Sequence, residues 1–318
     1  MTSRCHMTQR VREYLALRRA FGVQLTIQGE QLQRFARFAD RVAPGDPLTI
    51  DLALRWAQMS PTGKQTFAAR RLLILRPFAR YLRTVEPRTE IPPQRLLGSP
   101  RYRPAPHIYT PDEMRALLDA TNGLRPVGGL RSRTVRTYLS LLACTGMRSP
   151  EPLRMTRPDV DFGSQTITIR RTKFSKSRLV VLHPTTTEAL GAYARMRDRR
   201  VPHPHSSAFF VCDDGRALTP ARAVRAFAWL RRRLGWTRPP GRRWPRLYDI
   251  RHTFVCERLL AWHRDGIDVH VAMPALSTYL GHVKVTDTYW YVTAVPELMA
   301  TVSARFERFV SDRNGGQQ

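Results

Sequence analysis

Side chains that can bind a phosphate, transfer a proton or attack phosphorus are grouped in four short segments of this 318-residue chain. They are Arg148 and Glu151 in TGMRSPEPL, Lys173 in TKFSK, Arg251 and His252 in LYDIRHTF, and His282 and Tyr291 in LGHVKVTDTYWY. Cutting a phosphodiester without a metal needs a nucleophile, fixed positive charge on the non-bridging oxygens, and an acid for the departing oxygen. The four segments together hold side chains of each kind.

Taken singly, each of these residues also has an ordinary structural role. A lone arginine on a helix is usually a solvated charge, and a lone His in a Leu-Gly-His turn is often a cap. A Tyr-Trp-Tyr run usually anchors a core or an interface, because these side chains bury large surfaces. Only the occurrence of all four segments together favours catalysis.

The four segments resemble the tyrosine recombinase (integrase) family, which includes the Xer recombinases, Cre and phage integrases. The family's first box, TG-x-R-x-x-E, is matched by TGMRSPE, and its second, H-x-L-R-H, by YDIRH with one departure. In its third box LGH is followed nine residues later by Tyr, as His282 is followed by Tyr291. The resemblance covers about residues 110 to 310 and extends more loosely to the helical N-terminal region. The aromatic segment also resembles recombinases carried by transposons and integrative elements.

The resemblance implies a role for each residue. Tyr291 would be the nucleophile, with Tyr289 as a packing group, because residues two apart on a helix face roughly opposite ways. Arg148 and Arg251 would clamp the scissile phosphate with bidentate hydrogen bonds. Lys173 corresponds to the family's catalytic lysine and would protonate the 5'-oxygen from a hairpin turn. Arginine is a poor proton donor, which is a chemical reason for a lysine at this position. The alternative is an ordinary contact of this lysine with the DNA backbone.

The remaining residues of these segments are expected to assist. His252 and His282 would hydrogen-bond the phosphate and help to transfer protons. Glu151 resembles an acidic family position that orients its catalytic neighbours, while a capping or surface role is an equal alternative. Two basic residues of the hairpin are expected to contact DNA: Lys176 and Arg178.

One position departs from the family pattern. Tyr248 stands where many relatives have His. A phenol can still donate a hydrogen bond to phosphate, but its pKa near 10 makes it a poor base at neutral pH. The identity of the base that accepts the nucleophile's proton is therefore open, and His252 is the closest substitute.

The charge of the chain points to a polyanionic partner. It holds 53 Lys and Arg against 25 Asp and Glu, a formal net charge of +28. A coding bias could explain the preference for arginine over lysine, but it cannot explain the shortage of acids. Duplex DNA is the expected partner, bound by a homo-tetramer on paired sites as the family implies.

Neither a metal nor another cofactor is implied. The four cysteines lie far apart and form no metal-ligand spacing, so they are expected to be reduced and mostly buried. His203 and His205 could suggest a metal clip, but without nearby acidic or thiol partners they are more often solvated. The N-terminus lacks an apolar signal core and no stretch is long enough to span a membrane, which predicts a location in the cytoplasm or nucleoid.

The apolar spacing predicts a mainly α protein with a small antiparallel β hairpin. Residues 1–95 should form a helical domain, 96–109 a Pro-rich linker and 110–318 an α+β domain. The resemblance implies that the first is a core-binding (SAM-like) DNA-binding domain and the second the catalytic domain. The first domain should hold helices near 8–20, 28–42, 49–58 and 63–84. The second should hold a helix from Thr110, a helix-turn-helix around 134–155 with Ser149 as a cap, and a hairpin around TKFSK. Its later helices are expected near 185–199, 219–234, 246–264, 269–280 and 286–310.

The sequence thus predicts a site-specific recombinase that forms a 3'-phosphotyrosyl intermediate and exchanges strands through a Holliday junction. A type IB topoisomerase has similar chemistry but relaxes supercoils as a monomer without a specific site. A catalytically silent DNA-binding homologue is the alternative from another class. Relaxation of DNA that lacks a recombination site, and trapping of a covalent adduct, separate the three.

Overall fold

A computed structural model of the chain describes residues 6–59, 65–99, 105–170, 177–238, 240 and 243–291. The chain divides into two compact units, Met1–Arg103 and Pro104–Gln318, and each is described by itself. The division falls inside the segment 96–109 that the sequence suggests as a linker. The domain bounds drawn from the sequence stay a prediction.

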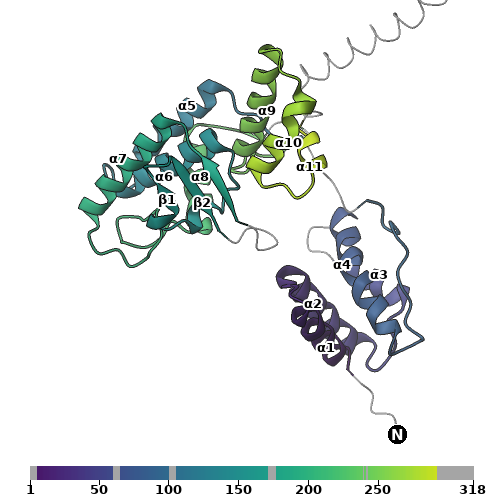
Figure 1. The fold of residues 1–318 in the computed structure, drawn as a ribbon. Coiled ribbons are helices and arrows are strands. Elements are labelled where there is room, and N and C mark those ends of the chain that lie inside the picture. Colours follow the sequence, from purple (N-terminus) through teal and green to yellow (C-terminus); the bar gives the residue numbers. More distant parts are fainter. Residues whose placement is uncertain are drawn as a thin grey trace, which may run out of the picture. The chain divides into compact units, whose positions relative to one another are not determined.

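The first unit is helical, as its apolar spacing predicts (Figure 1). Its helices are α1 Met7–Ala20, α2 Thr26–Val42, α3 Ile50–Gln58 and α4 Gln65–Arg83. Their apolar faces meet in one core, where the rings of Phe35 and Trp56 pack edge to face at 5.3 Å. Asp40 of α2 accepts the backbone N–H groups of Met7 and Thr8, so α2 also supplies the cap for the start of α1.

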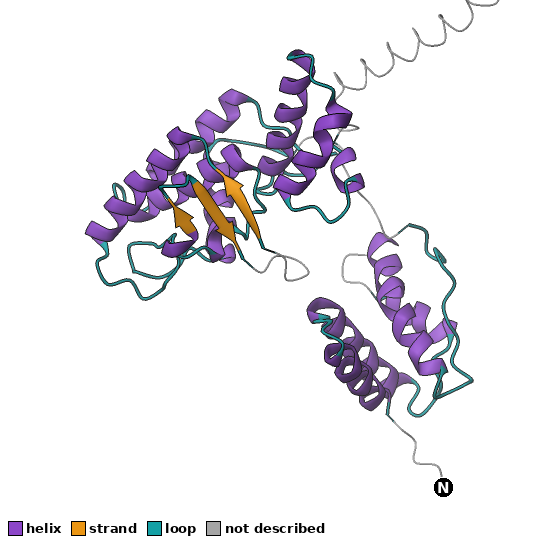
Figure 2. Cartoon of the chain, in the orientation of Figure 1, coloured by secondary structure: helices purple, strands orange, loops and turns teal. Residues whose placement is uncertain are grey.

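The second unit consists mainly of helices around a small sheet (Figure 2). Its described helices are α5 Pro111–Ala120, α6 Leu130–Thr145, α7 Pro184–Arg200, α8 Pro220–Arg233, α9 Asp249–Arg264, α10 Val269–Leu280 and α11 Thr286–Tyr289. Short 3₁₀ turns are η1 Thr121–Gly123, η2 Pro152–Arg154 and η3 Arg157–Asp159. α5 begins with a capping box in which Thr110 and Glu113 satisfy each other's backbone N–H groups. The helices predicted from 185 to 280 are confirmed, and the predicted helix 286–310 lies outside the described residues beyond 291.

The predicted hairpin is confirmed and gains a third strand. Strands β1 Val160–Asp161, β2 Thr166–Ile169 and β3 Arg178–Val181 form an antiparallel sheet in the order β1-β2-β3. Ile167 pairs with Val180, and both are fully buried on the face that packs on the core. Leu179 and Val181 alternate to the other, exposed face. The fold class expected from the sequence, mainly α with a small antiparallel sheet, is therefore confirmed.

The expected helix after Ser149 is wrong. The structure has only the single turn η2 there, and Ser149 caps nothing: its carbonyl accepts a hydrogen bond from the hydroxyl of Tyr138 (2.8 Å). Pro150 and Pro152 are compatible with a first helical turn, where no intrahelical N–H is needed, but the turn does not continue. The chain then becomes extended at Met155, whose carbonyl accepts the N–H of Phe209 (2.7 Å) and leads into the sheet.

Two absences concern the described residues alone. No helix among them is long and apolar enough to cross a membrane. No group of three or more of their His, Cys, Asp and Glu side chains is placed to hold a metal ion. Of the cysteines there, Cys212 and Cys256 are buried and Cys144 is exposed, and none of the three forms a disulfide.

Candidate active site

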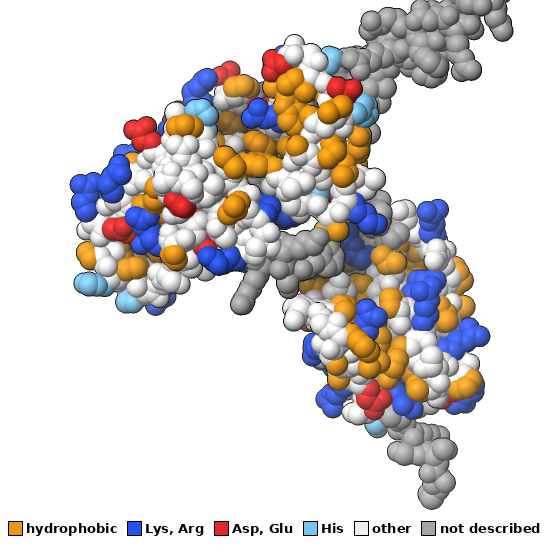
Figure 3. Space-filling view, viewed as in Figure 1, with side chains coloured by type: hydrophobic (Ala, Val, Ile, Leu, Met, Phe, Trp, Pro, Cys, Tyr) orange, Lys and Arg blue, Asp and Glu red, His pale blue; other side chains and the backbone are white. Residues whose placement is uncertain are grey.

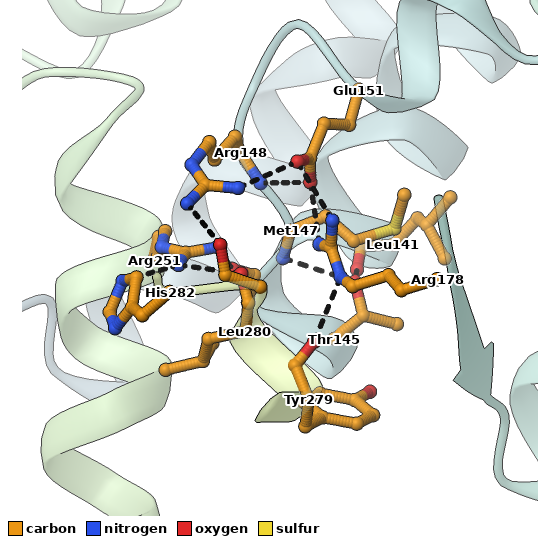
Figure 4. Close-up of polar contacts among 12 residues, drawn as sticks. Leu141, Thr145, Met147, Arg148, Glu151, Arg178, Arg251, Tyr279, Leu280 and His282 are labelled. Atoms are coloured by element: carbon orange, nitrogen blue, oxygen red, sulfur yellow. Dashed lines mark hydrogen bonds and ion pairs between the residues drawn. The ribbon is translucent and has the colours of Figure 1, made fainter. Parts of the chain in front are cut away.

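Two arginines bring together three segments that are far apart in the sequence (Figure 4). Arg148 follows the left-handed turn at Gly146 that ends α6, and Arg251 lies in the first turn of α9. Arg148 Nη2 donates to the carbonyl of Gly281 (2.7 Å), and Arg251 Nη1 donates to that of Gly146 (2.8 Å). Arg251 Nη2 also donates to the carbonyl of Leu280 (3.0 Å). The end of α6, the start of α9 and the end of α10 therefore meet at one place.

Arg251 is a buried cation with neutral partners. Its side chain is 1% exposed, and none of the described Asp and Glu residues forms an ion pair with it. Burial lowers the pKa of its guanidinium, and the phenol of Tyr291 acts in the opposite direction. Arginine remains protonated at working pH despite such a shift. A buried cation without a counter-charge strongly favours the binding of an anion.

Glu151 is buried between two guanidinium groups. Its carboxylate accepts the backbone N–H of Arg148 (2.9 Å) and Arg148 Nη1 (3.0 Å). It also accepts both terminal nitrogens of Arg178, at 3.0 and 2.8 Å. Burial raises the pKa of Glu151, but the hydrogen bonds and charges of the two arginines outweigh it and hold the pKa below its ordinary value. This position favours the orienting role over the surface role that the sequence leaves open.

His282 is neutral and held at both ring nitrogens. Its Nε2 lies 2.8 Å from Arg251 Nη2, and its Nδ1 lies 2.7 Å from the hydroxyl of Thr288. Arginine can only donate, so Nε2 must accept and Nδ1 must carry the proton that is donated to Thr288. Burial, followed by the charges of Arg251 and Arg148, lowers the pKa of His282 to about 4.

His252 and Tyr248 lie on the same end of α9. The side chain of His252 is 6% exposed, and its Nδ1 makes no hydrogen bond to the residues that the structure describes. Burial lowers its pKa to about 4. The Tyr248 ring packs edge to face on it at 5.1 Å, and Tyr248 itself is 42% exposed. His252 is therefore a buried neutral base, and Tyr248 is open to solvent above it.

The two tyrosines of the aromatic run contact different groups. Tyr291 is 3% exposed, and its ring centre lies 5.1 Å from that of His252 and 6.2 Å from that of His282. Burial raises the pKa of its phenol, and the charge of Arg251 opposes this rise. The hydroxyl of Tyr289 instead lies 3.2 Å from Nδ1 of His270. The structure thus places Tyr291, and not Tyr289, beside the imidazoles of His252 and His282. The role of Tyr291 as nucleophile stays a prediction.

Of the three hairpin residues that the sequence analysis singled out, the structure describes one. Lys173 and Lys176 lie outside the described residues. Arg178, expected from the sequence to contact DNA, opens β3 and is only 12% exposed. All three nitrogens of its guanidinium donate to protein oxygens, two to Glu151 and one to the carbonyl of Tyr279 (2.9 Å). Three of the five N–H groups of Arg178 are thus used within the protein, and its contact with DNA stays a prediction.

Thr288 is a site residue that the sequence analysis missed. It is fully buried, and its hydroxyl accepts the proton that His282 carries on Nδ1 because Arg251 donates to Nε2. The only signal in the sequence is a Thr one helical turn before Tyr291, in the polar stretch TDT. Thr288 lies in the short helix α11, which places its hydroxyl beside the imidazole of His282.

Comparisons with known proteins agree with this geometry. The phage integrase family matches residues 108–297 of this chain. A provisionally named integrase/recombinase of Sinorhizobium fredii, y4rB, is 37% identical over 96% of this chain and 98% of its own length. Tyrosine recombinase XerC of Chlamydia caviae is 29% identical over 70% of this chain and 65% of its own.

A solved structure shares the fold. The Tn1549 transposon integrase, in complex with transposon right end DNA, superposes with a TM-score of 0.67 at 16% identity, covering 96% of this chain and 100% of that one. The family match spans more than half of the 318 residues and includes every described residue of the candidate site. The chain therefore belongs to the phage integrase family and is a tyrosine recombinase, an enzyme of site-specific DNA recombination.

Proposed function

We propose that this recombinase cuts and rejoins duplex DNA through a 3'-phosphotyrosyl intermediate formed by Tyr291, and that it exchanges strands through a Holliday junction. The observation that carries the proposal is the position of the Tyr291 phenol. It is buried beside the rings of His252 and His282 and is influenced by the charge of Arg251. A nucleophile, two neutral bases and an unneutralised cation therefore share one site.

Arg148 and Arg251 are proposed to bind the scissile phosphate. The guanidinium groups of Arg148 and Arg178 share the single carboxylate of Glu151, whereas Arg251 forms no ion pair with the described Asp and Glu residues. Backbone carbonyls orient Arg148 and Arg251 without cancelling their charge. Such preorganised charge stabilises a phosphorane-like transition state more than the substrate, because charge develops on the oxygens that it faces.

The proposed step balances its protons. The Tyr291 oxygen attacks phosphorus and loses its proton to a neutral imidazole, for which His252 is the candidate, because Nε2 of His282 already accepts from Arg251. The bond to the 5'-oxygen breaks, and Lys173 donates the proton that makes this oxygen a hydroxyl. In the second step the 5'-hydroxyl of the partner strand attacks the phosphotyrosine and releases Tyr291. The phosphodiester bond energy is conserved, so the reaction needs no nucleotide cofactor.

Duplex DNA at specific sites is the proposed substrate. Lys and Arg predominate over Asp and Glu on the visible face of the helical unit (Figure 3). Its exposed arginines include Arg12, Arg19, Arg34, Arg37, Arg41, Arg70, Arg80 and Arg83. Tn1549 integrase has been solved with transposon DNA, which supports DNA as the ligand of this fold. We also propose a homo-tetramer on paired sites and a location at the nucleoid, both from the family chemistry and the charge.

A trapping experiment tests the proposal. Binding sites are first selected from a pool of random duplexes, and a nick is then placed near the centre of the selected site so that religation is impossible. The wild-type protein should accumulate an adduct that survives denaturation and blocks the 3' end. Tyr291→Phe should form none, while Tyr289→Phe, the matched control, should form it. An adduct that persists in Tyr291→Phe would contradict the assignment, and relaxation of plasmids that lack the selected site would favour a topoisomerase.

A further inference from the structure

Arg178 has no role in the reaction steps proposed above. It is the first residue of β3. Its Nη1 and Nη2 donate to the two carboxylate oxygens of Glu151 at 3.0 and 2.8 Å, and its Nε donates to the carbonyl of Tyr279 at 2.9 Å (Figure 4). The same carboxylate oxygens bind Arg148.

We propose that Arg178 is a positioning residue which, acting through Glu151, holds Arg148 in the arrangement that binds the scissile phosphate. The inference rests on the proposed function of this site. Arg178 is largely buried, and its Nε, Nη1 and Nη2 each donate within the protein. Its effect reaches the phosphate through Arg148.

The first argument is geometric. Glu151 accepts both the main-chain N–H and the side chain of Arg148, so its position determines where that guanidinium points. Glu151 is in turn held by a fork of two parallel hydrogen bonds from Arg178. A lysine could not replace the fork, since an ammonium group donates from a single point. Without Arg178 the carboxylate of Glu151 could shift, and Arg148, which is bound to it, would shift as well.

The second argument is the fit against Gly281. A Cβ at Gly281 would lie 3.0 Å from Arg178 Nη1 and 3.1 Å from its Cζ, so the guanidinium packs directly on the backbone of this turn. Gly281 has φ +68°, and its carbonyl accepts Arg148 Nη2. It also precedes His282. Arg178 thus contacts the turn that presents His282 as well as the carboxylate that orients Arg148.

The third argument is electrostatic. Glu151 is 10% exposed, and in the native arrangement two arginines share its single negative charge. Without Arg178 the carboxylate would be neutralised by Arg148 alone. Arg148 would then be held by a buried ion pair, which competes with the phosphate for the same guanidinium. Removing the carboxylate charge should relieve part of this defect.

The test compares Arg178→Met, Arg178→Lys, Glu151→Gln and the double variant Arg178→Met/Glu151→Gln. Arg115→Met is the control, because it removes an equal charge from an exposed helix of the same unit. The readouts are the first-order rate of adduct formation at saturating nicked duplex, and the DNA affinity. Circular dichroism melting shows which variants are folded.

Arg178→Met should lower the saturated rate roughly 10²-fold, as expected when a catalytic group is misplaced by about 1 Å. Its DNA affinity should equal that of Arg115→Met. The saturated rate of Arg178→Lys should lie between the rates of Arg178→Met and Arg115→Met. The double variant should react faster than Arg178→Met, because the effects of residues that act as a unit are not additive. A merely structural role would not give this recovery.

Three results would overturn the inference. They are a saturated rate for Arg178→Met equal to that of Arg115→Met, a defect confined to DNA affinity, and additive losses in the double variant. If Arg178→Met does not fold, an unchanged rate in Arg178→Lys would overturn it equally. Failure of the proposed function is distinguishable, because the wild-type protein itself would then form no adduct. In that case additive effects of the Arg178 and Glu151 substitutions on the melting temperature would still refute the coupling.

Discussion

The Nδ1 atom of His282 lies 2.7 Å from the hydroxyl oxygen of Thr288, a residue with no exposed surface. Thr288→Val keeps the shape of the side chain but removes the acceptor for the Nδ1 proton. A buried donor left unpaired costs about 1–3 kcal/mol, so adduct formation should slow roughly tenfold to hundredfold. Thr288→Ser should retain the rate. Equal rates for Thr288→Val and the wild type would show that the hydrogen bond between His282 and Thr288 does not matter to the reaction.

Gly146→Ala should be severely destabilising. Gly146 has φ +59°, and an added Cβ would lie 2.2 Å from Cδ1 of Phe254. Gly266→Ala is the matched control, because Gly266 has φ +71° with nothing within 4 Å. Both changes incur the left-handed cost of about 1–2 kcal/mol, and overpacking should add about 1–3 kcal/mol at Gly146 alone. Urea unfolding measures the difference, and equal losses in the two variants would remove the steric explanation.

The two imidazoles should make stability depend on pH. His252 and His282 each have a folded-state pKa of about 4, below the ordinary value of 6.5. Between these values the unfolded chain binds more protons, so the free energy of unfolding should fall as the pH drops from about 6.5 towards 4. The expected slope is about 1.4 kcal/mol per pH unit for each imidazole. Urea unfolding of the wild type and of His252→Gln/His282→Gln should show this slope only in the wild type, and parallel profiles would refute it.

Lys173 should behave as the general acid. Lys173→Ala should cleave normal DNA on the order of 10²- to 10⁴-fold more slowly, because the 5'-oxygen would have to leave without a proton. The same variant should recover on a duplex with sulfur in place of the bridging 5'-oxygen, since a thiol pKa near 8.5 makes thiolate a good leaving group. The comparison is one of single-turnover rates on the two substrates. An equal defect on both would assign Lys173 to DNA positioning.

The order and spacing of residue types were sufficient to identify the family and most of the candidate site. A helix repeats every 3.6 residues and a strand every two, so apolar spacing alone predicted α1 to α10 closely and the β2–β3 hairpin. The same periodicity separated Tyr289 from Tyr291, because residues two apart on a helix cannot reach one point. These are properties of short stretches of chain and need no knowledge of the rest of the molecule.

Contacts between distant segments were decided only by the tertiary structure. Arg178 is 27 residues from Glu151, and Arg148 is 133 residues from Gly281, so no local pattern reports that these groups meet. The sequence analysis therefore predicted only a DNA contact for Arg178 and missed its hydrogen bonds to Tyr279 and Glu151. The sequence analysis missed Thr288 and the neutral state of His282 for the same reason, because both depend on burial and on hydrogen-bond partners in the folded chain. Residue types determine what chemistry is available, and packing determines which of them share a site.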